Sequence, residues 1–330
     1  MGLLDIGLEV DLERLFGWKD TTFVVSSFTG HGRDFSAEVV GDLGVVSNIF
    51  SDTEFNIFNI HLHKEFEAFG SNKNYFKLGQ IAADDEFMIA DTAGLFINSS
   101  FGPFNTQSAN VGAPIFPLGA PGAVVHLAPS DKWFFQAGIY AGDAGPGGSS
   151  DRGFDWEWGG AAGVVVFAEA GVQINELGGV VKVGGFYHTG DFDEIVTGET
   201  VDGLGAIWTI VDQPIIASSK GEIGVNVFGR ASIAPQDDRA TATGQFDGGL
   251  VISNIGFKGA QFGIGATHTT FGDDFAEVNG VTDSETVIEM TYLIPVNDYF
   301  AIQPDIQYIG SPNESDDDAF VLGVRGSVSF

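Results

Sequence analysis

Residues 4–13 read LDIGLEVDLE, with an apolar side chain at every second position and an acidic residue or glycine between them. Because strand side chains alternate between two faces, a period of two predicts a strand with one apolar face and one polar face. A run of about ten residues is the length that a tilted strand needs to cross a bilayer. This segment is therefore predicted to be a membrane-spanning strand.

The same alternation returns in residues 319–330, AFVLGVRGSVSF, which close on Phe330. An apolar outer face on this strand gains nothing from water but is well placed against lipid. Similar segments occupy residues 21–29, 55–68, 74–82, 122–129, 131–142, 160–175, 178–190, 204–213, 221–234, 244–254, 257–271, 284–295 and 298–310. With one more strand expected in 35–50, the count is about sixteen, an even number as a closed bacterial barrel requires. The sequence thus predicts one all-β domain over residues 1–330, a closed antiparallel transmembrane β-barrel.

The connections alternate between short turns, such as 176–179 and 295–298, and longer polar loops, such as 191–203 and 272–283. Short turns at one end and long loops at the other are typical of an outer-membrane barrel. Much of the acid lies in the long loops, so that end of the barrel is expected to be strongly negative. Association of Ca²⁺ with these acidic loops is left open, although they lack the ligand spacing of an EF-hand.

Residues 83–120 interrupt the alternation and are too long for a turn. Loops of this length in compact proteins are usually functional or disordered, and the many apolar residues here argue against disorder. We expect residues 84–112 of this segment to fold into the barrel and narrow it.

The composition excludes several classes of protein. The chain has 45 Asp and Glu against 14 Lys and Arg, a net charge of −31, which would repel nucleic acid. No apolar run approaches the roughly eighteen residues that a spanning helix needs. Residues 1–16 lack a basic start, a continuous apolar run and a cleavage site, so we expect an export signal to be missing from this sequence.

Three regions carry a resemblance to a known family. They are LGQIAADDEF with DTAGLFINSSFG in residues 78–102, YHTGDF with VDQP in 187–192 and 211–214, and IQPDIQYIGSP with AFVLGVRGSVSF in 302–312 and 319–330. On these motifs the chain resembles the carbohydrate-selective porins of the OprB type over most of its length. The resemblance implies a sixteen-stranded outer-membrane barrel that admits glucose and related sugars, with an inward-folded segment at its constriction. It also implies outer-membrane lipid and lipopolysaccharide as surroundings, and a monomer or homotrimer.

If the apolar positions face lipid, the alternate positions form a polar interior. The residues predicted to line the pore or bind substrate are Arg230, Arg325, Glu289, Asp84, Asp85, Glu86, Asp91, Asn98, His126, Gln303, Asp305 and Gln307. Arg230 and Arg325, with Glu289 as their counter-charge, are the best candidates for sugar contact, because a guanidinium offers several donors to hydroxyl groups. The alternative for all of them is plain pore wall.

The function classes that remain share the barrel. A sugar porin is favoured over a non-selective or cation-preferring pore, and both over an outer-membrane enzyme or adhesin. No nucleophile elbow, zinc-binding His-Glu-x-x-His or phosphate-binding glycine loop is present, so neither an enzyme nor a cofactor is predicted. His61 and His63 share one strand face, but without further ligands they are a weak metal signal.

Overall fold

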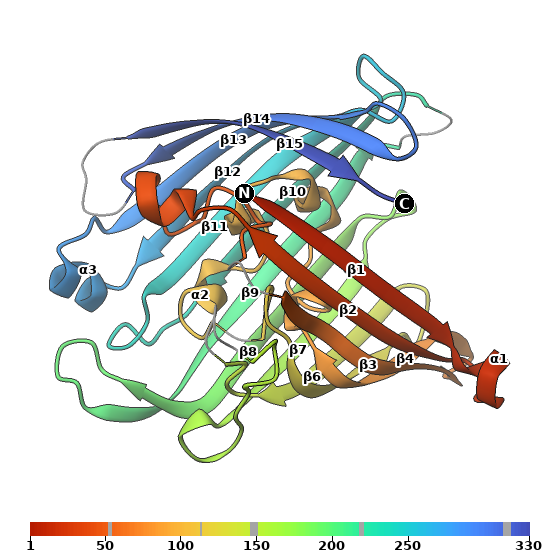
Figure 1. Cartoon of the computed structure of the whole chain (residues 1–330), viewed down its shortest axis with the longest axis horizontal. Helices are drawn as coiled ribbons and strands as arrows, with labels where there is room; N and C mark the ends of the chain where they lie inside the picture. Colours follow the sequence, from red (N-terminus) through yellow and green to blue (C-terminus); the bar gives the residue numbers. More distant parts are fainter. Residues whose placement is uncertain (52–54, 113, 146–150, 218–220, 313–317) are drawn as a thin grey trace.

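The computed structural model describes residues 1–51, 55–112, 114–145, 151–217, 221–312 and 318–330 (Figure 1). Its strands are β1 (Gly2–Asp11), β2 (Thr21–His31), β3 (Phe55–Ala68), β4 (Ser71–Ile81), β5 (Ala120–Leu127), β6 (Trp133–Ala141), β7 (Val164–Gln173), β8 (Val180–Asp193), β9 (Thr200–Ile216), β10 (Gly224–Ile233), β11 (Ala242–Ser253), β12 (Gln261–Phe271), β13 (Ser284–Pro295), β14 (Phe300–Gly310) and β15 (Ala319–Val328). The helices are α1 (Leu12–Phe16), the π-helix η1 (Ser36–Val40), the 3-10 helices η2 (Ala83–Asp85), η3 (Asp91–Leu95), η4 (Ser99–Phe101) and η5 (Gly160–Ala162), α2 (Asn105–Ser108) and α3 (Asp273–Asn279). None of these described helices is long and apolar enough to cross a membrane.

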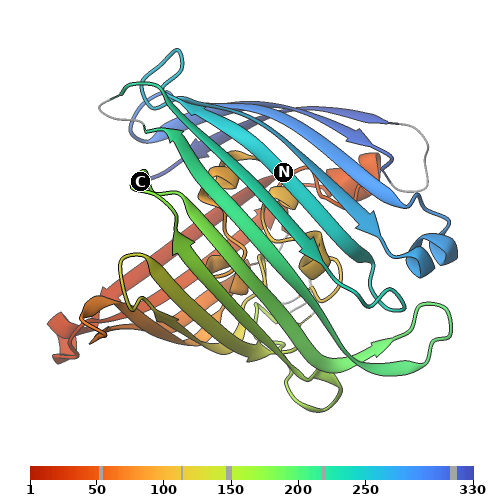
Figure 2. The ribbon, with the colours of Figure 1, turned by 180° about the vertical axis from the view of Figure 1, so that it is seen from behind.

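The fifteen strands form one sheet in which each strand pairs with its neighbours in sequence, and the pairs are antiparallel. Figures 1 and 2 show this sheet curling around a central space. The all-β antiparallel prediction is therefore confirmed. Among the described residues no pairing joins β1 to β15, which are the two ends of the strand order.

The prediction of a strand within residues 35–50 is wrong. Residues 36–40 form η1, which ends at Gly41 with a φ of 82°, and residues 41–50 are turns and bends. Paired apolar residues such as Val39-Val40 do not alternate, and the Asp34 carboxylate accepts a hydrogen bond from the Ala37 amide (2.9 Å), which favours a helical turn. The other fifteen expected segments each contain a strand.

Exposure alternates along the strands as the sequence predicts. On β9, Ile207 is 60% exposed while Trp208 is 3% exposed, and on β10 Ile233 is 55% exposed while Arg230 is 3% exposed. The outer surface is thus an apolar band of the kind that faces lipid in a barrel.

The interior is not uniformly polar, which corrects the sequence-based expectation. Four large aromatic side chains of β7–β10 point inward and are buried: Phe167, Phe186, Trp208 and Phe228. They pack in one apolar cluster with aromatic residues of the segment 84–112, among them Phe87, Phe96, Phe101 and Phe104. This burial gives the segment a hydrophobic core of its own against the barrel wall.

Candidate functional site

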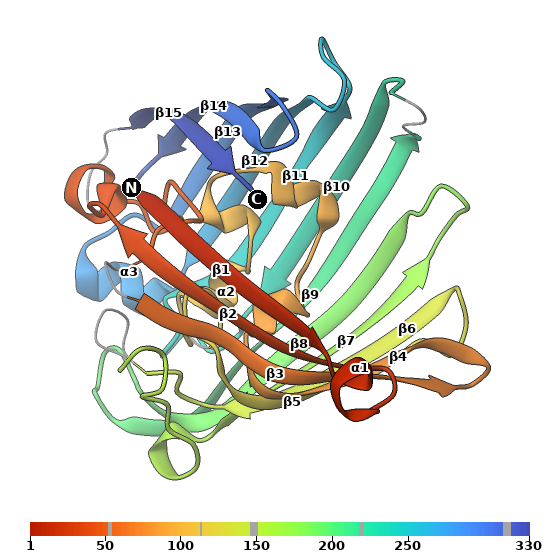
Figure 3. The same cartoon turned by 45° about the vertical axis from the view of Figure 1, so that its right-hand side comes forward.

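The segment 84–112, called here the inward segment, lies on the concave side of the sheet (Figure 3). Carboxylates of the wall hold its backbone. Glu289 of β13 accepts hydrogen bonds from the amides of Ile97 (2.7 Å) and Asn98 (2.8 Å), one to each oxygen. Asp212 of β9 accepts from the Thr92 amide (2.8 Å) and hydroxyl (2.5 Å). These charge-assisted bonds are the strong class of hydrogen bond.

A second stretch, residues 41–50, lies against the inward segment and is held in the same way. Glu285 of β13 accepts from the amides of Leu43 (2.8 Å) and Gly44 (2.9 Å). The Asn48 amide donates to the Ile97 carbonyl (2.8 Å), and the Ser99 amide donates to the Val45 carbonyl (3.0 Å). The residues wrongly expected to form a strand therefore brace the inward segment.

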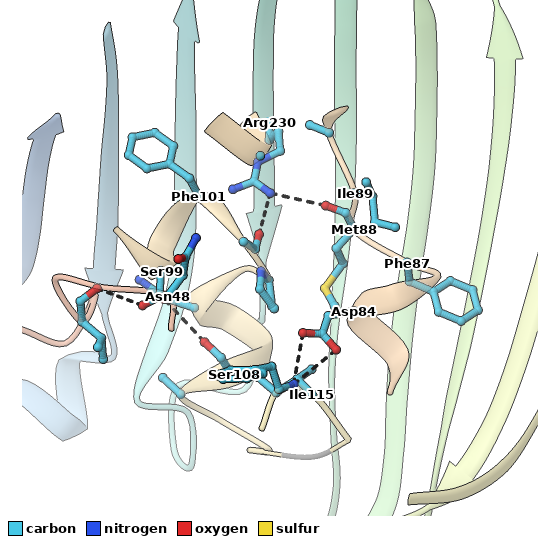
Figure 4. Close-up of a pocket in the computed structure, with 18 of the residues that line it drawn as sticks. Asn48, Asp84, Phe87, Met88, Ile89, Ser99, Phe101, Ser108, Ile115 and Arg230 are labelled. Atoms are coloured by element: carbon cyan, nitrogen blue, oxygen red, sulfur yellow. Dashed lines mark hydrogen bonds between the residues drawn. The ribbon is translucent and has the colours of Figure 1, made fainter. Parts of the chain in front are cut away.

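Arg230 is the most fully engaged cation of the interior (Figure 4). Its Nε donates to Asp247 of β11 (2.7 Å), and the two terminal nitrogens donate to backbone carbonyls of Met88 (3.3 Å), Gly102 (2.6 Å) and Ser100 (3.0 Å). The guanidinium also lies 4.8 Å from the centroid of the Phe104 ring. Four of the five N–H donors that an arginine offers are thus in use. The expectation that Glu289 is the counter-charge of Arg230 is wrong, because Arg230 forms its ion pair with Asp247.

The polar residues near Asn98 form one network. The Asn98 side-chain amide donates to Gln307 (3.0 Å), and Gln307 donates to Asp305 (2.8 Å) and to the Val46 carbonyl (2.9 Å). Glu289, Gln307 and Asn98 are almost completely buried. These residues hold the inward segment to β13 and β14.

The acidic run 84–86 lies where the inward segment leaves β4. Asp84 accepts from the Phe116 amide (3.1 and 3.3 Å), and burial together with the neighbouring Asp85 carboxylate raises the pKa of the Asp84 carboxyl. Asp85 accepts from Asn59 (2.8 Å), and Glu86 pairs with Lys77 and accepts from the Tyr75 hydroxyl (2.8 Å).

His126 belongs to the wall. Its ring stacks on Tyr75 with centroids 4.7 Å apart, and its Nδ1 lies 3.0 Å from the Gln136 amide oxygen. Among the described residues no group of three or more His, Asp or Glu is arranged to hold a metal ion.

Three cavities, among those that the described residues form, are lined by predicted pore residues. The largest, about 550 Å³, lies between residues 43–50 and the inward segment, and Figure 4 shows Asp84 and Arg230 at its wall. A smaller one, about 360 Å³, is lined by residues of η3 and of the facing wall: Asp91, Thr92, Gly94, Leu95, Asn226, Val251, Gln261, Leu293, Gln303 and Arg325. The third, about 490 Å³, lies along the seam between β1 and β15.

These cavities separate the predicted pore residues into groups. Arg230 and Asp84 line the largest cavity; Asp91, Gln303 and Arg325 line the smaller one; Asp305, Gln307 and again Arg325 line the seam cavity. The others, Asp85, Glu86, Asn98, His126 and Glu289, line none of these three cavities.

Sequence reasoning missed several groups that shape the site. Asp212, Asp247 and Glu169 all anchor the inward segment or its arginine, with Glu169 accepting from the Met88 amide (3.3 Å) and the Trp208 indole (2.8 Å). Their alternate positions on the strands place them inward, and that parity was the available signal.

An antiparallel sheet with an apolar outer face, curled around a hydrogen-bonded segment that lines two cavities, defines an outer-membrane pore protein. The family described as "Carbohydrate-selective porin, OprB family" matches the chain over residues 1–330. The chain belongs to this family, as its motifs predicted. It is accordingly a porin of the bacterial outer membrane and not an enzyme.

Relatives agree with this assignment. "Putative porin QuiX" of Acinetobacter baylyi is 23% identical over 369 residues, covering 100% of this chain and 83% of the relative. "Porin B" of Pseudomonas aeruginosa is 22% identical over 376 residues, covering 98% and 80%. The solved high-pH structure of Pseudomonas putida OprB has a TM-score of 0.84 at 19% identity, covering 99% of this chain and 87% of that one, which supports the fold.

Proposed function

We propose that the protein is a pore for the passive diffusion of glucose and related neutral sugars. The observation that carries this proposal is the smaller cavity, where amide and guanidinium groups converge: Asn226, Gln261, Gln303 and Arg325. Side chains of these types offer donors and acceptors that suit hydroxyl groups without requiring a charged solute. A volume of about 360 Å³ lies near the lower limit of small-molecule sites, which suits a monosaccharide better than a long oligosaccharide.

Arg325 is better placed for sugar contact than Arg230. It is half-buried and lies directly opposite Gln303 in the pairing of β14 with β15. One terminal nitrogen donates to Ser47 (3.1 Å) and Asn48 (2.7 Å), which directs the guanidinium toward the interior. Arg230, in contrast, is committed to Asp247 and three carbonyls, so we assign it to positioning the inward segment.

Replacing Arg325 with Ala is expected to weaken glucose block of ion current, raising the half-blocking concentration by roughly tenfold, as expected for the loss of a charge-assisted hydrogen bond. The measurement is single-channel conductance in a planar bilayer with increasing glucose. Arg239→Ala is the matched control, since Arg239 binds Asp238 and the Gly203 carbonyl outside these cavities. Equal block in Arg325→Ala and the parent would reject the assignment.

A cation-preferring diffusion pore is the second candidate. It is favoured by the net charge of −31 and by the exposed Asp91 carboxylate in the smaller cavity, because charged rings in a pore select ions. Reversal potentials in a salt gradient measure this preference. A pore that selects cations but shows no block by glucose would favour this candidate over the sugar pore.

We also propose that the sheet is closed in the membrane as a sixteen-stranded barrel, by one further strand between β1 and β15. Neighbours in the sheet are antiparallel, so β1 and β15, both odd in the order, run in the same direction. One strand antiparallel to both restores the alternation. An open sheet edge in lipid would leave backbone groups without hydrogen bonds, at several kcal/mol each.

Closure is tested with single-cysteine pairs placed along β1 and β15 in protein isolated from outer membranes. With a strand between them the two edges are about 10 Å apart, which is beyond disulfide reach but within that of a short bifunctional cross-linker. A spontaneous disulfide at any register would show direct pairing of β1 with β15, and the sixteen-stranded proposal would be rejected.

A further inference from the structure

The lumen face of η3 is marked by two residues. Asp91 and Gly94 are exposed, whereas Thr92 and Ala93 between them are buried at 7% and 2% exposure. In a 3-10 helix, residues three apart lie on the same side. Asp91 and Gly94 therefore look together into the open interior.

The backbone around Gly94 is fixed from both sides. Thr92 is bound to Asp212, and the Leu95 carbonyl accepts from the Gln303 side chain (2.8 Å). Two residues further on, Ile97 is bound to Glu289. Gly94 thus stands on a short helix whose position is set by three separate strands of the wall.

Neither the backbone nor the packing requires glycine at this position. A Cβ added at Gly94 would have no atom within 4 Å, and Gly94 is not among the glycines with positive φ. Two glycines of β12 on the other side of the segment differ. A Cβ at Gly263 would lie 2.8 Å from Leu95, and one at Gly265 would lie 2.9 Å from Phe96. Gly263 and Gly265 make room for side chains of the inward segment, whereas the space beside Gly94 is filled by no atom of the protein.

Gly94 lies in the walls of two cavities. Among the described residues Gly94 is the only one that lines both the largest cavity and the smaller one. Arg325 also lines the smaller cavity, and its bonds to Ser47 and Asn48 join it to the wall of the largest cavity. We take the surroundings of Gly94 as the junction of the two cavities, because η3 contributes Gly94 to both walls and the Arg325 contacts tie both walls together.

We propose that Gly94 sets the aperture of the pore: its missing side chain is the opening through which a solute passes from the larger cavity to the smaller one. Gly94 is in this sense a specificity-determining residue, admitting a single sugar ring and slowing chains of several rings. The selectivity for sugars rests on the proposed function, but the narrowing of the passage does not.

The first experiment adds side chains of increasing volume at Gly94. Gly94→Ala, Gly94→Leu and Gly94→Phe are expected to reduce single-channel conductance in that order, with a loss on the order of twofold or more for Phe. In liposome swelling, entry of maltotriose should fall more steeply than entry of glucose. The matched control is Gly229→Phe on β10, another glycine with open space and no positive φ, which lines none of the three cavities. Its neighbours Phe228 and Arg230 are buried on the inner face, so position 229 lies on the outer face of the sheet.

A second experiment uses the absence of cysteine in the sequence. In Gly94→Cys the only thiol lies at the junction, so methanethiosulfonate reagents with bulky positive or negative groups should block current, and reducing agent should restore it. Gly229→Cys, on the outer face of β10, serves as control. Heat-modifiable migration confirms that each variant is folded.

The outcomes separate the two proposals. Conductance and maltotriose entry in folded Gly94→Phe equal to those of the parent would overturn the aperture proposal. Reduced conductance in Gly94→Phe, together with a parent that admits no sugar, would support the aperture and reject the sugar pore. Reduced conductance with stronger exclusion of maltotriose than of glucose supports both.

Discussion

Replacing Arg230 with Ala is expected to lower the free energy of unfolding by about 3–5 kcal/mol, the usual cost of leaving a buried charge without its partner. Asp247, 5% exposed, would keep its charge among buried groups, and the carbonyls of Met88, Ser100 and Gly102 would lose their donor. Urea unfolding of the folded protein in detergent measures the loss. The same change should make the ionic current larger and noisier, because the inward segment loses the three hydrogen bonds that Arg230 donates to its carbonyls.

Two variants test the cause of this effect. Arg230→Lys keeps the charge but cannot supply the planar fork of donors, so it should recover part of the stability and little of the steady current. Arg230→Met combined with Asp247→Leu removes both charges and should recover stability without restoring the bonds to the segment. Unchanged stability and current in Arg230→Ala would contradict the positioning role.

Replacing Glu289 with Ala is expected to have the second-largest effect. The amides of Ile97 and Asn98 would be left without their acceptors in a buried place, at about 1–3 kcal/mol each. We expect a lower midpoint in urea and a noisier, larger conductance.

Glu289→Gln is the matched variant. Its amide oxygen still accepts one hydrogen bond while the charge is gone, so it should lie between the parent and Glu289→Ala in both measurements. If Glu289→Ala and Glu289→Gln behave alike, the charge rather than the pair of amide bonds explains the effect, and the fastening argument fails.

The strands could be predicted from the sequence because each carries its own evidence. Alternation is visible within ten residues, and lipid on one side demands it, so segments such as 4–13 and 319–330 were identified without knowledge of their neighbours. The prediction of a strand within residues 35–50 failed because the paired valines and the Asp34 side chain favour a helical turn. The apolar content of a short segment does not distinguish such a turn from a strand.

The interior was harder to predict because its contacts join distant parts of the chain. Parity placed Arg230 inward, but the choice of Asp247 over Glu289 depends on register, since Arg230 lies directly opposite Asp247 in the β10–β11 pair. Alternation predicts polar side chains on the face toward a water-filled lumen. Phe167 and Phe228 nevertheless point inward, because the inward segment and not water covers them. Gly94 carries no side chain and so gave no signal at all.

Five charged or polar side chains of the wall bind the inward segment through its main chain. Glu289, Asp212 and Glu169 receive backbone amides, while Arg230 and Gln303 donate to backbone carbonyls. Main-chain groups are the same in every residue except proline, which lacks the amide. Lumen-facing positions of the inward segment can therefore be substituted while these main-chain hydrogen bonds to the wall persist. The same holds for exchange with a segment of equal length and similar backbone conformation. The lumen-facing side chains of the inward segment can thus change while the strands of the wall stay the same, and such changes can alter which solutes pass.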